Sequence, residues 1–288
     1  MYPVLFGFLP SFGVLVATGF LVGVALWGKL LQRYGLEPDK DPDRSSDTAV
    51  WLLIGVIAGA RLLYVAVEIA RYLTTKATPS VGHDFVQDPL KILFVWEGGL
   101  VMFGGFAGAV LLGFWKARKY GLHPWNALDT GLVGGFVGQA IGRWGCLLVG
   151  DDYGSVVDEK YADLPFPITL RVPSAEWLAE NPKSLFEHDL AGQVLWATQP
   201  WMSVNALIVA LLGWLVLRRR RYFGQVAGVI FIYYSVSRAV IEAFRGDELR
   251  GVWGGFSTSQ ILAVVGVAVG VAVLATAKKR PVPESLAP

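Results

Sequence analysis

Residues 10–31 read PSFGVLVATGFLVGVALWGKLL, and the first charged side chain among them is Lys29. About 20 mostly apolar residues are enough for an α-helix to cross the hydrocarbon core of a membrane. The sequence therefore predicts an all-α membrane protein, with residues 1–288 forming one polytopic domain. Six further apolar stretches complete a predicted bundle of seven transmembrane helices, at residues 48–72, 99–117, 127–149, 201–217, 224–244 and 256–277.

The composition agrees with a chain that faces lipid. Hydrophobic residues make up 54% of it and charged residues 17%, whereas soluble domains carry roughly a quarter charged residues. A single cysteine, Cys146, excludes an internal disulfide framework. The three histidines are scattered without ligand spacing, so we expect no metal site and no cofactor. No phosphate-binding loop, dinucleotide fingerprint or basic-aromatic surface for nucleic acid is recognisable.

Lysine and arginine are distributed unevenly between the predicted helices. Fourteen of them fall on one side if the helices alternate in direction. The positive-inside rule places that side in the cytoplasm, so the N-terminus is predicted outside and the C-terminus inside. Residues 150–200 then form a small, irregular and acidic extracytoplasmic head between the fourth and fifth helices. The fourteen cations are Lys29, Arg33, Lys40, Arg44, Lys116, Arg118, Lys119, Arg218, Arg219, Arg220, Arg221, Lys278, Lys279 and Arg280.

Charged side chains inside the apolar stretches are the candidate functional residues. Burying such a group in hydrocarbon costs roughly 3 kcal/mol or more, so it needs a partner or a function. Arg238, Glu242 and Arg245 share one helix face by their spacing and can pair along it. For Glu68 and Asp129, an ion pair that only fixes helix packing is at least as good an explanation as a function.

Three arginines on three predicted helices lie at a similar depth in the outer half of the membrane. They are Arg61, Arg143 and Arg238, and Arg245 follows just beyond the last of these helices. Cations gathered at one depth repel one another unless an anion joins them. A lipid phosphate suits this position because guanidinium groups bind phosphate bidentately and stay charged when desolvated.

Four segments, taken in order, resemble the motifs of bacterial prolipoprotein diacylglyceryl transferases. Residues 142–154 read GRWGCLLVGDDYG and resemble the signature of that family, which ends a membrane helix and closes a loop on Gly154. The other three are GARLLY at 59–64, WEGGLVMFGG at 96–105, which contains Gly104, and SRAVIEAFRGD at 237–247. Because these segments are spread from residue 59 to residue 247, the resemblance covers nearly the whole chain.

The resemblance implies an enzyme of the bacterial inner membrane. Its members transfer the diacylglyceryl group of phosphatidylglycerol to the lipobox cysteine of a prolipoprotein, whose signal peptide is part of the substrate, and release glycerol phosphate. Arg143 and Arg238 would hold the phosphate, and Asp151 or Glu242 would serve as the base. Arg61, Arg245, Gly104 and Gly154 would complete the phosphatidylglycerol site.

The chain also departs from the family pattern. Phe103 stands where family members commonly have His or sometimes Tyr, and an aromatic hydrocarbon ring cannot accept a proton. This difference keeps a second hypothesis open, a non-catalytic paralogue that binds an anionic phospholipid or a signal peptide. A lipid or small-anion transporter is a third, which would require alternating access.

Overall fold

A computed structural model describes residues 1–5, 7–76, 78, 80–95, 98–246, 252–253 and 256–286. The side chains of Met102, Phe103, Val252, Trp253, Ser285 and residues 256–260 fall outside this description, as do Trp96, Glu97 and Asp247 from the family-like segments. The chain packs as two compact units, one formed by Met1–Gly35 and Leu128–Pro288 and the other by Leu36–Ala127.

A helix occupies each of the seven apolar stretches. These helices are α1 (Ser11–Tyr34), α2 (Asp41–Thr75), α4 (Met102–Lys119), α5 (Pro124–Val149), α7 (Thr198–Leu217), α8 (Gln225–Glu242) and α9 (Thr258–Ala277). Among the described residues, α1, α2, α5 and α7 are long and apolar enough to cross a membrane, and α9 contains a shorter apolar helical stretch, Ile261–Ala277. The prediction of a helical membrane protein is therefore confirmed at this level.

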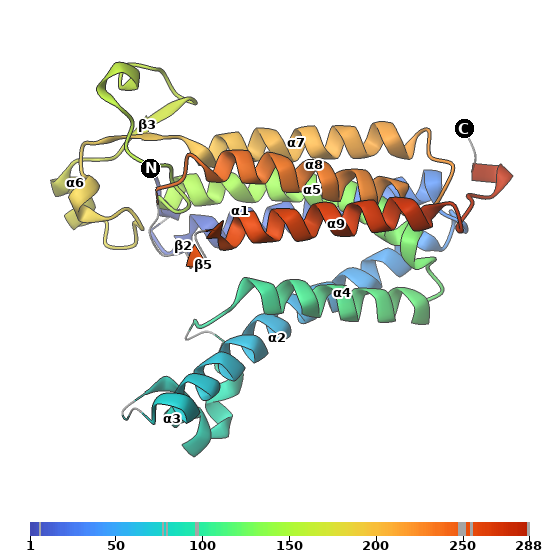
Figure 1. Ribbon diagram of the computed structural model, residues 1–288, viewed down its shortest axis with the longest axis horizontal. Coiled ribbons are helices and arrows are strands. Elements are labelled where there is room, and N and C mark those ends of the chain that lie inside the picture. The colour runs from blue at the N-terminus through green and yellow to red at the C-terminus, as the bar shows by residue number, and fades with distance from the viewer. Residues whose placement is uncertain are drawn as a thin grey trace. The chain divides into compact units, whose positions relative to one another are not determined.

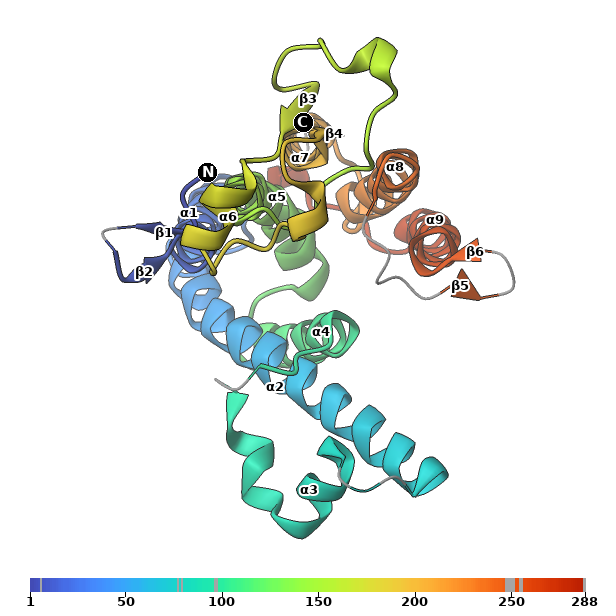
Figure 2. The same ribbon diagram turned by 90° about the vertical axis from the view of Figure 1, so that its left-hand side faces the viewer.

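Helix α5 lies at the centre of the first unit. Figure 2, which looks along these helices, shows α5 between α1, α7 and α8. Val133 and Phe136 of α5 belong to one buried cluster with Val209 of α7 and Ile230 of α8. The backbones of α1 and α5 cross closely, because a Cβ atom added to Gly19 would collide with the carbonyl oxygen of Gly138. Small residues at four-residue spacing allow this approach.

The segment between α5 and α7 is the irregular head that the sequence predicts, although its side of the membrane stays a prediction. Strands β3 (Thr169–Arg171) and β4 (Val194–Trp196) pair antiparallel, with Leu170 opposite Leu195. Helix α6 (Ala175–Glu180) and two 3-10 turns, Glu159–Tyr161 and His188–Leu190, fill the rest. A small core of its own, which includes Tyr153, Val172 and Phe186, holds the segment together. Figure 1 shows it at one end of the helices of this unit.

Short strands flank the terminal helices of the first unit. Strands β1 (Val4–Leu5) and β2 (Leu9–Pro10) form a hairpin before α1, and β5 (Val252–Trp253) pairs with β6 (Phe256–Ser257) before α9. A last 3-10 turn covers Glu284–Leu286.

The second unit is built on the pairing of α2 with α4. Gly55 and Gly59 of α2 face Gly108 and Gly104 of α4, and a Cβ on any of the four would collide with a carbonyl group opposite. Helix α3 (Val81–Gln87) and the 3-10 turn Pro89–Leu93 connect the two long helices. At about 1.5 Å per residue, the 35 residues of α2 span roughly 52 Å, which exceeds a hydrocarbon core of about 30 Å.

Helix α2 begins seven residues before the predicted stretch because its first turns are polar and internally paired. Arg44 Nη1 lies 2.7 Å from a carboxylate oxygen of Glu37 and 3.1 Å from one of Asp41. Because these charges neutralise one another, the helix can begin in this polar segment, ahead of the apolar stretch at 48–72.

Candidate functional site: arginines paired with carboxylates

The chain reverses direction just after α5, and this reversal places a carboxylate next to Arg143. Gly150 and Asp152 both adopt a positive φ, +78° and +58°, which reverses the chain just beyond the helix. Such a φ is uncommon outside glycine, but Asp tolerates it better than most residues. The reversal aims the carboxylate of Asp152 at Arg143, with which it forms an ion pair.

The same carboxylate bridges to a second arginine. One oxygen of Asp152 pairs with Arg143, and the other pairs with Nη2 of Arg245 just beyond α8. Arg245 is only 3% exposed. Asp152 lies outside the membrane-spanning helices, three residues after the end of α5. Burial opposes its ionisation, but the two guanidinium groups outweigh this cost and hold the pKa of Asp152 below its ordinary value.

Arg238 forms a separate pair within α8. Its guanidinium binds the carboxylate of Glu242 one turn later, as their spacing predicts. Arg238 also lies within electrostatic range of Arg143, Arg245 and Asp152. Three of the predicted arginines therefore gather at one place in the first unit, which is the cluster formed by Arg143, Arg238, Arg245, Asp152 and Glu242.

The start of α7 holds this cluster in place. Helix α7 begins three residues before the predicted stretch, and Thr198 and Gln199 in its first turn bind the reversed loop. Thr198 Oγ1 donates to the carbonyl of Asp152 at 2.7 Å, and Gln199 Nε2 donates to the carbonyl of Asp151 at 2.8 Å. Both side chains are fully buried. The Oε1 atom of Gln199 has no hydrogen-bond partner among the described residues, so it can accept one from a bound group.

Gly154 and Asp151 lie directly beside the cluster. The backbone of Gly154 runs antiparallel to that of Arg245, and its N–H donates to the carbonyl of Trp196 at 3.0 Å. A Cβ on Gly154 would press against Trp196 and the carbonyl of Phe244. The Asp151 carboxylate accepts the N–H of Asp152 at 2.8 Å. Gly154 thus allows the chain carrying Arg245 to approach the loop.

A lipid phosphate that joins these arginines stays a prediction, and the structure adds internal partners to it. Two carboxylates of the chain itself already pair with them, and the more central one, Asp152, was not singled out from the sequence. Two adjacent acids in a loop look alike in a sequence. Only the backbone reversal at Gly150 decides which of them turns inward.

Arg61 belongs to the second unit and has a different environment. Its guanidinium donates to the carbonyls of Lys91 at 2.7 Å, Ile92 at 2.9 Å and Gly98 at 2.6 Å, and at 3.4 Å to that of Gly99. It is 4% exposed. Its predicted place in a phosphate site stays a prediction, while its contacts show that it shapes the segment before α4. Gly104, in the same unit, lies at the α2–α4 crossing.

The remaining charged residues have structural partners. Asp129, fully buried, pairs with Arg220 at 3.1 Å and accepts the N–H groups of Gly224 and Ala227 at the start of α8. Arg220, which the sequence analysis counted among the fourteen cations on one side, is therefore buried in an ion pair. Glu68 pairs with the exposed Arg71 at 3.1 Å. Cys146 is buried, with its sulfur 3.8 Å from Nη1 of Arg143.

These observations define a class of protein: a multi-pass helical membrane protein with half-buried arginines collected at the end of its helices. Comparison with known proteins narrows this class. Residues 3–276 match the family model described as prolipoprotein diacylglyceryl transferase. The chain therefore belongs to the prolipoprotein diacylglyceryl transferase family, as the four sequence segments predicted.

Two relatives show how much of the chain the similarity covers. A protein of Synechococcus elongatus named phosphatidylglycerol–prolipoprotein diacylglyceryl transferase is 31% identical over 265 residues, which cover 90% of this chain and 80% of the relative. A protein of a Nostoc species with the same name is 30% identical over 279 residues, covering 95% and 87%. The similarity includes both units and the head.

Proposed function

We propose that this chain transfers the diacylglyceryl group of phosphatidylglycerol to the lipobox cysteine of prolipoproteins and releases glycerol phosphate. The names of its relatives and the match to the family model support this activity. The observation that carries the proposal is the gathering of Arg143, Arg238 and Arg245 at one site.

The reaction explains why such a site is useful. The sulfur of the acceptor cysteine attacks the glyceryl carbon that is bonded to the phosphate oxygen. A C–S bond forms, the C–O bond breaks, and its electron pair leaves with the phosphate. Negative charge grows on this leaving group because a phosphodiester becomes a phosphate monoester. Guanidinium groups fixed beside it stabilise the charge where it develops.

The charge balance of the cluster suits an anionic lipid. Three guanidinium groups meet two carboxylates in its ion pairs, which leaves one excess positive charge. A phosphodiester carries one negative charge. We infer that the lipid phosphate takes over Arg143 and Arg245 from Asp152, while Glu242 keeps Arg238 in position.

The same exchange supplies a candidate for the base. The acceptor thiol has an ordinary pKa near 8.5, so a carboxylate must take its proton for fast reaction at neutral pH. Asp151 and Glu242 are the candidates from the sequence, and the site adds Asp152. Once the phosphate holds the arginines, Asp152 loses the cations that lower its pKa and becomes a stronger proton acceptor.

The phosphatidylglycerol-binding role that the resemblance implies for Arg61, Gly104 and Gly154 stays part of the proposal, and each of these residues orders the backbone of its own unit. Arg61 holds the carbonyls of Gly98 and Gly99, which precede α4. Gly104 keeps α4 against α2, and Gly154 keeps Arg245 beside the loop. Each is a positioning residue rather than a group that touches the reacting atoms.

The proposed setting is a single seven-helix domain in the bacterial inner membrane. The N-terminus and the head face outward and the C-terminus faces the cytoplasm, as the distribution of lysine and arginine indicates. The arginine cluster lies at the head end of α5 and α8, so it would face the outer leaflet. There it would meet both phosphatidylglycerol and an exported signal peptide.

Complementation tests this proposal. A bacterial strain depleted of its own transferase should recover growth with the wild-type chain and not with Arg143→Ala or Arg238→Ala at equal membrane level. Arg118→Ala, which removes an exposed arginine at the end of α4, is the matched control and should also restore growth. The activity is refuted if the wild-type chain fails where the Synechococcus elongatus relative succeeds.

A further inference from the structure

Residues 161–168 of the head expose apolar side chains that its own small core does not use. Tyr161, Leu164, Phe166 and Ile168 are all exposed, and Phe166 is 53% exposed. In Figures 1 and 2 this part of the chain, between the 3-10 turn Glu159–Tyr161 and β3, projects sideways beyond α7 rather than continuing along the helices. These exposed apolar side chains are therefore available to a partner outside the head.

Two tryptophans fix the depth of the segment. Trp144, in the last two turns of α5, has its ring 6.5 Å from that of Phe166. Trp201, in the first turn of α7, donates its Nε1–H to the carbonyl of Pro167 at 2.8 Å. The segment is therefore held at the level where α5 ends and α7 begins.

That level coincides with the end of a lipid-facing surface. Trp201 stands 3, 7 and 10 residues before Val204, Ile208 and Leu211, which places all four on one face of α7. These three aliphatic side chains are exposed, Val204 by 55%. Helix α7 is long and apolar enough to cross a membrane, so this face meets lipid. Tryptophan at the end of such a face is typical of the membrane interface.

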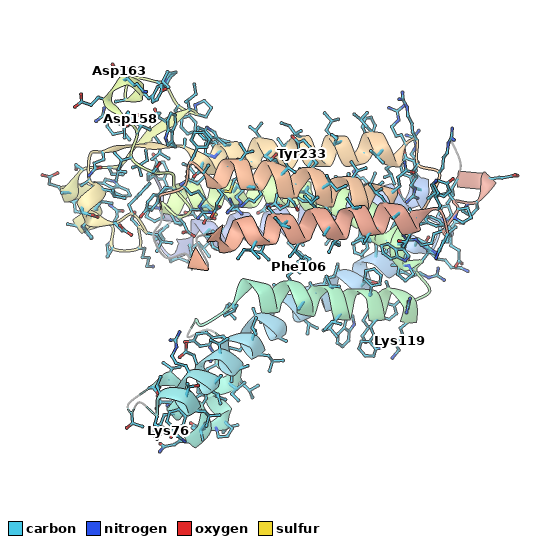
Figure 3. All side chains as sticks on the ribbon, in the orientation of Figure 1. Lys76, Phe106, Lys119, Asp158, Asp163 and Tyr233 are labelled. Carbon is cyan, nitrogen blue, oxygen red and sulfur yellow. The ribbon has the colours of Figure 1, made fainter. Side chains whose placement is uncertain are left out.

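We propose that residues 161–168 lie in the membrane interface, with Leu164 and Phe166 in contact with lipid at the boundary between headgroups and acyl chains. The partner is the apolar part of the bilayer rather than an anionic headgroup. The charged residues next to and within the segment are mostly acidic: Asp158 and Glu159 precede it, Asp163 lies within it, and Lys160 is the single cation among them. Figure 3 shows Asp158 and Asp163 on this projecting part of the head.

Residues 161–168 are connected to the arginine cluster through the packing of Trp196. The ring of Trp196 lies 5.5 Å from that of Tyr161 and 5.7 Å from that of Phe244. The backbone carbonyl of Trp196 accepts the N–H of Gly154. Lipid bound by the segment would therefore lie next to the proposed site, although the interface contact does not depend on the proposed activity.

Depth-dependent quenching tests the proposal on the full chain in vesicles. In a Cys146→Ser background, single cysteines at Leu164 and Phe166 carry an environment-sensitive fluorophore. Lys183→Cys, exposed elsewhere on the head, is the aqueous control, and Ile208→Cys on α7 is the lipid-facing control. Lipids that carry a spin label near the headgroup or deep in the acyl chain serve as quenchers.

The labels at 164 and 166 should be quenched at least twice as strongly as the label at 183, and more by shallow than by deep spin labels. The result should be the same in phosphatidylcholine vesicles with or without phosphatidylglycerol. Quenching equal to that at 183 overturns the proposal, and quenching that requires phosphatidylglycerol overturns its apolar basis. A lipid-borne photoreactive group on the wild-type chain tests the same contact without any variant, and its adducts should fall within residues 161–168 and not 181–190.

Discussion

Asp152 is the residue on which the proposed exchange depends, because it occupies the two guanidinium groups that the lipid phosphate would need. Replacing it with Asn removes this internal competitor, so the KM for phosphatidylglycerol should fall by about tenfold, which corresponds to ~1.4 kcal/mol. Asp189→Asn, which removes an exposed carboxylate elsewhere on the head, is the matched control. Transfer kinetics at varied lipid content measure the change. A higher KM in Asp152→Asn would mean that its carboxylate orders the arginines instead of competing with the lipid.

The same residue makes the stability of the protein depend on pH. The pKa of Asp152 is lowered in the folded chain, so its ion pairs stabilise the fold above the unfolded-state pKa of about 3.9. This stabilisation is lost as the pH falls through the lower, folded-state pKa. The thermal unfolding midpoint of the wild type in detergent should exceed that of Asp152→Asn at pH 6, and the gap should close below about pH 4. A constant gap would contradict the pairing.

Single residues also show how far the sequence could predict the site. Arg143, Arg238 and Arg245 stand out because charge in an apolar helix is costly and because the segments around them resemble a family. Asp152 could not be preferred over Asp151, since the positive φ at Gly150 and at Asp152 itself sets their directions. The four carbonyls around Arg61 belong to an irregular segment whose path no periodicity predicts.

Among the elements, the close crossing of α1 and α5 depends on glycine. Gly138→Ala should lower the free energy of unfolding by about 1–3 kcal/mol, because its Cβ would collide with the backbone of Gly19. Gly135→Ala is a control in the same helix, where nothing lies within 4 Å of the added Cβ. It should be neutral or slightly stabilising, since alanine favours a helix more than glycine does. Equal destabilisation by both changes, measured by thermal unfolding in detergent, would argue against the crossing.

The start of α8 is held by a buried ion pair. Asp129→Asn should destabilise the protein by about 3–5 kcal/mol, because Arg220 would remain buried without its charged partner. Glu37→Gln, which weakens an exposed cluster before α2, is the control and should change the unfolding midpoint little. A midpoint for Asp129→Asn that matches the control would show that the pair contributes nothing.

The starts of α2 and α7 lie before the predicted stretches for one physical reason. Apolar content predicts where a helix can face lipid; a helix occupies each of the seven stretches, and among the described residues four of these helices are long and apolar enough to cross a membrane. Polar turns that bind their surroundings lengthen a helix beyond that part. Thr198 and Gln199 extend α7 by bonding to the head, and Asp41 and Arg44 extend α2 by pairing with each other.

At the scale of the whole molecule, Phe103 is the departure from the family that bears most on activity. A histidine at this position could accept a proton, whereas the phenyl ring cannot. If the carboxylates beside the arginines supply the base, Phe103→His should change the transfer rate by less than about threefold and shift its pH profile little. A large gain in rate, measured in membranes with a lipobox peptide, would show that the wild-type chain lacks its base.

The central claim is tested most directly by following both products with the purified chain. Vesicles of phosphatidylglycerol and a lipobox peptide should yield the peptide with a diacylglyceryl group on its cysteine, seen by mass spectrometry, and an equal amount of glycerol phosphate. Arg143→Ala should lose at least a hundredfold in rate, about 2.7 kcal/mol of transition-state stabilisation, while it remains folded by size-exclusion chromatography. Unchanged transfer by Arg143→Ala, or no transfer by a folded wild-type chain, would contradict the account.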